Sequence, residues 1–188
     1  MADWLRLAFG VVCGQEPSHT WAPGGVLLPF CQRCAGLYAG AAVGLALHAL
    51  LRLKPGARFL QVHGSFLLLM IPLGYHWLPQ EATVRTVSGV LYGAGMVSFL
   101  WLLPGPLAGG VRPLDRGRAL LYAAGVGAAL AGIPAAGAWG GVAGWYALVA
   151  LAALGAAGLL LLALANVGLG LADLASRWLH NGAMERRP

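Results

Sequence analysis

The chain has 188 residues, of which 59% are apolar and only 10% are charged, and its formal net charge is +6. Because about a quarter of the residues in a soluble domain are usually charged, this composition excludes a soluble globule, a disordered chain and a secreted disulfide scaffold. The bases do not alternate with aromatic residues on one soluble face, so no nucleic-acid partner is indicated. The composition predicts an integral membrane protein whose main partner is the lipid bilayer.

The N-terminal segment is too short to cross a membrane. Residues 4–12 are apolar but are interrupted by Arg6, and they are expected to form a short helix in the outer interface. Residues 14–30 contain Pro and Gly throughout, which predicts a structured loop that caps the helices. Residues 1–33 thus form a predicted outer-surface helix and cysteine-bearing loop.

Five apolar stretches are long enough to span the bilayer, which requires about 20 residues. They run from about 34 to 51, 59 to 78, 84 to 103, 119 to 138, and from 145 past 162. The sequence therefore predicts an all-α, polytopic bundle of five transmembrane helices over residues 34–171. The last pattern continues to Trp178, which is too long for one membrane helix, so we expect a bend or an amphipathic extension. Residues 172–188 are predicted to form a basic amphipathic tail in the cytoplasm.

The basic residues are distributed unequally when five helices are threaded alternately through the membrane. One side receives Arg52, Lys54, Arg58, Arg112, Arg116, Arg118, Arg177, Arg186 and Arg187, and the other receives Arg6, Arg33 and Arg85. Because cytoplasmic loops are enriched in Lys and Arg, this asymmetry predicts a cytoplasmic C-terminus. Residues 13–34 are then on the outer side.

Glycines recur every four residues on two of the predicted helices. They are Gly36, Gly40 and Gly44 on the first, and Gly89 and Gly93 on the third. Such stripes allow helix backbones to approach closely, which is how membrane helices pack. They predict helix–helix contacts, and a possible homo-oligomer through glycine-rich faces.

All three cysteines of the chain precede or begin the first predicted span. Cys31 and Cys34 form a CxxC motif where the helix starts, and Cys13 lies 18 residues earlier. The positive end of the helix dipole favours thiolates there, and Arg33 adds a fixed positive charge. This arrangement supports either metal binding by thiolates or dithiol–disulfide exchange.

A tetrahedral metal site would require a fourth ligand. His76 is the first candidate, because alternate threading brings the end of the second span to the outer side. His19, in the loop with Cys13, is the alternative. The other histidines, His48, His63 and His180, are expected near the cytoplasmic side, too far from the cysteines to bind.

Residues 13–40 closely resemble the signature of DUF2085, a family of small prokaryotic membrane proteins without an assigned activity. The first block is matched by Cys13, Gln15, Pro17, His19, Thr20 and Trp21. The second is matched by Leu28, Pro29, Cys31, Arg33, Cys34, Gly36, Tyr38 and Gly40, and a weaker match follows at Arg85, Gly89 and Gly93. The resemblance implies a prokaryotic cytoplasmic membrane as the location.

The chain departs from the family pattern at two positions. Gly14 stands where members often have His, and His76 is aligned where they often have an acidic residue. An acidic residue and a histidine both bind metals, so the second exchange modestly favours a metal site.

Three functions remain open at this stage. The first is a zinc site of Cys13, Cys31 and Cys34 with His76 or His19, structural if four protein ligands close the shell and open to a water if only the cysteines bind. The second resembles the disulfide-bond-forming membrane proteins, with Cys31 and Cys34 as a redox pair coupled to a quinone. The third is a transporter or lipid-binding protein. In that case the lipid phosphate or substrate would be held by Gln15, Arg33, Tyr38 and Arg85.

No catalytic base, nucleotide-binding loop or pair of haem-ligating histidines on one helix is identifiable, so the sequence assigns no reaction and leaves open whether the protein is an enzyme.

Overall fold

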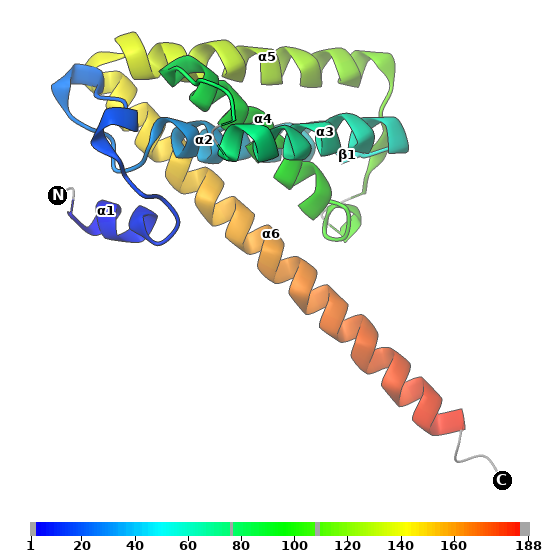
Figure 1. The fold of residues 1–188 in the computed structure, drawn as a ribbon. Helices are drawn as coiled ribbons and strands as arrows, with labels where there is room; N and C mark the ends of the chain where they lie inside the picture. Colours follow the sequence, from blue (N-terminus) through cyan, green and yellow to red (C-terminus); the bar gives the residue numbers. More distant parts are fainter. Residues whose placement is uncertain (1–2, 76, 108–109, 185–188) are drawn as a thin grey trace.

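The computed structural model describes residues 3–75, 77–107 and 110–184. Its α-helices are α1 (Asp3–Gly10), α2 (Gln32–Leu51), α3 (Ala57–Gly74), α4 (Ala82–Leu100), α5 (Arg116–Trp139) and α6 (Gly141–Met184) (Figure 1). Three short 3-10 helices are η1 (Pro17–His19), η2 (Pro23–Gly25) and η3 (Gly105–Leu107), and two short strands are β1 (Leu53–Lys54) and β2 (Arg112–Pro113). The chain is mostly helical, which confirms the predicted class.

Each predicted span corresponds to one helix, from α2 to α6. By length and apolarity, α2, α3, α5 and α6 are able to cross a membrane. The second span was predicted to reach residue 78, but α3 ends at Gly74. Four candidate spans are therefore established, and a fifth through α4 stays a prediction.

The helix α4, which is not among the four candidate spans, carries polar side chains on surfaces that face protein. Thr86, Ser88 and Ser98 are buried in it. Their hydroxyls donate hydrogen bonds to carbonyl oxygens of the same helix, those of Ala82, Arg85 and Ala94. Buried hydroxyls that are bonded in this way cost little, so α4 is stable among the other helices without a uniformly apolar sequence.

The helices α2 and α4 run parallel and pack at backbone distance. A Cβ atom on Gly40 would lie 2.6 Å from the Cα atom of Val90. Gly36 likewise faces Thr86, and Gly89 faces the Arg33 carbonyl on α2. The predicted packing role of these glycines is confirmed, and both stripes are engaged within one chain. A homo-oligomer would need other faces.

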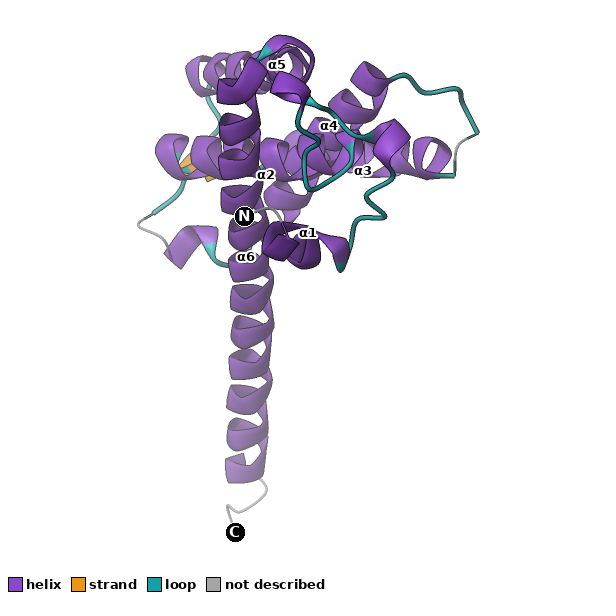
Figure 2. Ribbon diagram, turned by 90° about the vertical axis from the view of Figure 1, so that its left-hand side faces the viewer, coloured by secondary structure: helices purple, strands orange, loops and turns teal. Residues whose placement is uncertain are grey.

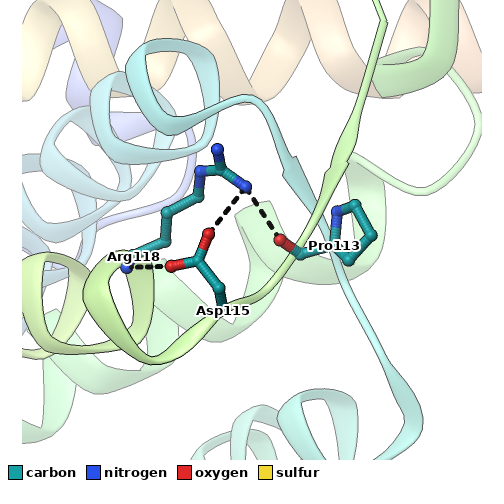
Figure 3. A network of polar contacts seen from close by, with 3 residues as sticks. All are labelled: Pro113, Asp115 and Arg118. Atoms are coloured by element: carbon teal, nitrogen blue, oxygen red, sulfur yellow. Dashed lines mark hydrogen bonds and ion pairs between the residues drawn. The ribbon is translucent and has the colours of Figure 1, made fainter.

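The loops that follow α2 and α4 meet at one end of the bundle. The strands β1 and β2 pair in parallel, with Leu53 opposite Arg112. Asp115 caps α5 there, because its carboxylate accepts a hydrogen bond from the backbone N–H of Arg118. The same carboxylate forms an ion pair with the Arg118 guanidinium (Figure 3). The six basic residues predicted for these two loops thus lie at the end of α2 opposite to the cysteines.

The helix α6 is longer than the bundle. It continues without a break from Gly141 to Met184 and extends away from the other helices (Figures 1 and 2). The first predicted alternative, a bend, is therefore wrong, and the second, an amphipathic extension onto the membrane surface, stays a prediction. Forty-four residues span about 66 Å, twice the thickness of the hydrocarbon core. Glycines at 168 and 170 do not interrupt the helix, because the main-chain hydrogen bonds continue through them and Leu and Ala surround them.

The N-terminal segment covers the end of the bundle where α2 begins. Phe9 of α1 packs edge-on against Phe30, with ring centroids 4.8 Å apart. The loop is fastened to two helices, since the Trp21 indole donates to the Thr86 hydroxyl and the Trp145 indole donates to the Leu27 carbonyl. The predicted short helix and structured loop are present.

Candidate metal centre

The three cysteines converge although 18 residues separate the first two. The sulfur atoms of Cys13, Cys31 and Cys34 all lie within 4.8 Å of one another. None of them forms a disulfide, and Cys13 is buried. Three thiolates around one zinc ion at 2.3 Å would be separated by about 3.8 Å, so the group is close to the size of a tetrahedral site.

Two turns of local structure position the sulfur atoms. The backbone N–H of Cys13 donates to the Phe9 carbonyl, which fixes the chain as it leaves α1. Cys31 is the N-cap residue of α2, and Cys34 lies one turn further along that helix. The backbone N–H of Cys31 donates to the Cys13 sulfur at 3.2 Å. A sulfur atom that accepts an N–H at a helix start is stabilised as a thiolate.

Hydrogen bonding makes Cys13 the most acidic thiol of the group. Bonds from the thiols of Cys31 and Cys34 lower the pKa of Cys13 to about 2. The hydrogen bond with Cys13 in turn raises the pKa of Cys31. A thiolate is therefore held between two potential further ligands, as metal binding requires.

The cysteines line a cavity of about 330 Å³ together with His19, Arg33 and Arg85. His19 belongs to η1, close to the sulfur atoms but outside the tight group that they form. The other candidate ligand, His76, lies outside the described residues. Of the predicted ligands that the structure describes, the three cysteines lie together, and His19 lies in the same cavity but outside their group.

The four residues predicted to hold a substrate or headgroup do not lie together. Gln15 lines the cavity, but its amide nitrogen donates to the carbonyls of Arg6 and Pro29. Its side chain therefore links parts of the N-terminal segment to each other. Tyr38 is buried in the core against Phe9, with ring centroids 5.3 Å apart, and does not line this cavity. Arg33 and Arg85 do share the cavity.

Two glutamines support these arginines and are not evident from the sequence. The amide oxygen of Gln80 accepts a hydrogen bond from Arg33, and that of Gln32 accepts one from Arg85 at 3.5 Å. Gln32 is buried. Its place within the CxxC motif is the one feature of the sequence that points to it. Gln80 lies in the loop between α3 and α4, where no sequence pattern marks it.

The histidines His48 and His63 are remote from the cysteines, as predicted. His48 lies in the last turn of α2, about 25 Å along the helix from Cys31. His63 bonds the Tyr122 hydroxyl at 2.7 Å and the Phe59 carbonyl. The bond to Tyr122 links α3 to α5, and the bond to Phe59 lies within α3.

The chain matches one known protein family over about half of its length. The DUF2085 family, described as a predicted membrane protein, matches residues 13–99. The resemblance to DUF2085 is thereby confirmed over those residues. The match begins at Cys13 and includes Cys31, Cys34, Arg33 and Arg85. No curated protein and no solved structure matches the chain.

Proposed function

We propose that this DUF2085 membrane protein binds one zinc ion through Cys13, Cys31 and Cys34. The observation that carries the proposal is the mutual proximity of the three sulfur atoms, within 4.8 Å, on segments 18 residues apart. Thiolates are soft ligands that select zinc among the common divalent ions of cells. The three free thiols, one buried and two partly buried, are gathered where the N-terminal loop meets α2.

The proposed role of the ion is structural. Cys13 ends the segment that contains α1, whereas Cys31 and Cys34 begin α2, so one ion would tie the N-terminal segment to the bundle. His19 is the proposed fourth ligand, since it lines the same cavity. His76 remains the alternative.

We further propose that the site faces the outer side of a cytoplasmic membrane. The support is the location of the basic loops that contain Arg52, Lys54, Arg112, Arg116 and Arg118 at the other end of α2. Positively charged loops stay in the cytoplasm.

The test is metal analysis of the full-length protein, purified in detergent without chelator. We expect one zinc per chain, and a loss of at least nine-tenths of it in Cys13→Ser, Cys31→Ser and Cys34→Ser. His19→Ala should weaken retention by at least about 10- to 100-fold, which is already the typical effect of losing a group that only supports a ligand. Ser18→Ala, an exposed neighbour of His19, is the matched control and should retain zinc. Metal-free wild-type protein would overturn the proposal.

The same proximity also favours one alternative, dithiol–disulfide exchange. The sulfur atoms of Cys31 and Cys34 lie close to each other and to the Cys13 thiolate. In this function, Cys31 and Cys34 would form a disulfide, and the two electrons and two protons that they release would reduce a quinone to a quinol. Protein that contains no zinc and in which a Cys31–Cys34 disulfide is reduced by quinol would support this function instead.

A further inference from the structure

The cavity beside the three cysteines contains two arginines with unused hydrogen-bonding capacity. Arg33 comes from the first turn of α2 and Arg85 from the first turn of α4, and both line the cavity of about 330 Å³. Because α2 and α4 run parallel, their positive N-terminal ends face the same cavity.

Arg33 is held in place at one nitrogen only. A terminal nitrogen of its guanidinium donates to the Leu73 carbonyl at 2.9 Å and to the Gln80 amide oxygen. Its Nε atom is buried and has no hydrogen-bond partner among the described residues. The guanidinium is therefore oriented by neutral groups and keeps its full charge.

Arg85 is in the same condition. One terminal nitrogen donates to the Gln32 amide oxygen at the long distance of 3.5 Å, and no residue that the structure describes pairs with the buried Nε atom. Within the described residues the ion pairs are those of Arg118 with Asp115 and Arg177 with Asp173, so neither Arg33 nor Arg85 has a carboxylate partner. Buried donors without an acceptor are costly, which favours an anionic ligand between them.

The charge of the proposed zinc centre does not neutralise the two arginines. Three thiolates and one zinc ion sum to one negative charge, against two positive charges on Arg33 and Arg85. This sum of charges rests on the proposed zinc site. The lack of partners for the two Nε atoms among the described residues does not rest on it. Among the described residues that line the cavity, Glu16 alone is acidic, but it is exposed to solvent and accepts a hydrogen bond from Ser18.

We propose that Arg33 and Arg85 bind the phosphate group of a membrane lipid. Guanidinium forks match phosphate oxygens, and two of them from adjacent helices would hold one phosphate. An apolar groove of about 630 Å³ adjoins the cavity at Val12, and Leu5, Phe9, Leu37 and Met96 also line it. A hydrocarbon chain attached to the phosphate has a place there that a free phosphate ion would not use.

The proposal is tested by ligand titration of the zinc-loaded full-length protein in detergent, followed by tryptophan fluorescence and calorimetry. The probes are dioctanoyl phosphatidic acid, dioctanoyl phosphatidylcholine and inorganic phosphate. We expect saturable binding of phosphatidic acid that Arg33→Gln and Arg85→Gln each weaken about tenfold or more. Arg33→Lys keeps the positive charge but lacks the forked guanidinium, so it should lose part of the affinity. This variant replaces Arg33→Gln in the test if Arg33→Gln does not fold.

Arg6→Gln is the matched control, because Arg6 is an exposed arginine of the same outer segment, and its variant should bind like wild type. Binding of inorganic phosphate as strong as that of phosphatidic acid, with the same arginine dependence, would identify a free phosphate as the source and overturn the lipid assignment. Binding of phosphatidylcholine that both arginine variants retain in full, or unchanged affinity for phosphatidic acid in both variants, would overturn the site itself.

Zinc content measured in the same samples separates this proposal from the proposed metal function. The arginine variants should keep their zinc, and Cys34→Ser should lose it. Zinc-free wild-type protein that binds phosphatidic acid through Arg33 and Arg85 would contradict the metal site alone. Zinc-loaded protein that binds none of the probes would contradict the phosphate site alone.

Discussion

The backbone N–H of Cys31 donates a hydrogen bond to the sulfur of Cys13 at 3.2 Å. This bond joins the residue that ends the N-terminal segment to the residue that begins α2. It also turns the sulfur of Cys13 towards the two sulfur atoms of the CxxC motif. The proposed zinc ion would reinforce a connection that the polypeptide already makes.

Removal of the ion should destabilise the protein. A ligand that binds only the folded state raises stability in proportion to the logarithm of its concentration over its Kd. We therefore expect a strong zinc chelator to lower the Tm of the wild type, followed by circular dichroism, and to leave the Tm of Cys13→Ser unchanged. An equal fall in both proteins would show that the chelator acts elsewhere.

The thiolate absorbance near 240 nm should report the ionisation of Cys13 in zinc-free, reduced protein. Hydrogen bonds lower its pKa from 9.0 to about 2, so one thiolate should persist at pH 5. Because the folded pKa lies below the unfolded one, this ionisation stabilises the fold fully above pH 9, and the stabilisation is lost as the pH falls towards 2.

Cys31→Ala removes the largest cause of this low pKa and should move the titration of the Cys13 thiolate to higher pH. Cys13→Ala should abolish the absorbance at pH 5. A wild-type protein with no thiolate at pH 5 would contradict the hydrogen-bonded arrangement of the three sulfur atoms.

The packing of α2 on α4 predicts an asymmetry among glycine variants. A Cβ on Gly40 would lie 2.6 Å from the Val90 Cα, so Gly40→Ala should force the helices apart and cost about 1–3 kcal/mol. Gly127→Ala on α5 is the control, because nothing lies within 4 Å of its Cβ position. Unfolding in detergent measures both. Equal stability of the two variants would exclude the close approach.

The orientation of the protein is tested by thiol labelling of whole cells. In a chain with all three cysteines replaced by alanine, Glu16→Cys should react with an impermeant maleimide from outside. Ser176→Cys, on the exposed end of α6, should react only after lysis. The reverse pattern would place the cysteine site in the cytoplasm.

The hydropathy pattern was sufficient to locate the helices, because lipid exposure requires apolar residues over a whole span. The clustering of Cys13 with the CxxC motif likewise predicted their convergence. The continuous course of α6 was not predictable, since length alone suggested two elements. The anchoring of Arg33 by Gln80 depends on how α3 ends against α2, a long-range contact that leaves no local pattern.

X-ray absorption at the zinc edge tests the central claim most directly. On purified wild-type protein we predict three sulfur neighbours at about 2.3 Å and one nitrogen neighbour at about 2.0 Å, and loss of the nitrogen in His19→Ala. A spectrum with fewer than three sulfur neighbours, or protein that contains no zinc at all, would contradict the proposed joint ligation by Cys13, Cys31 and Cys34.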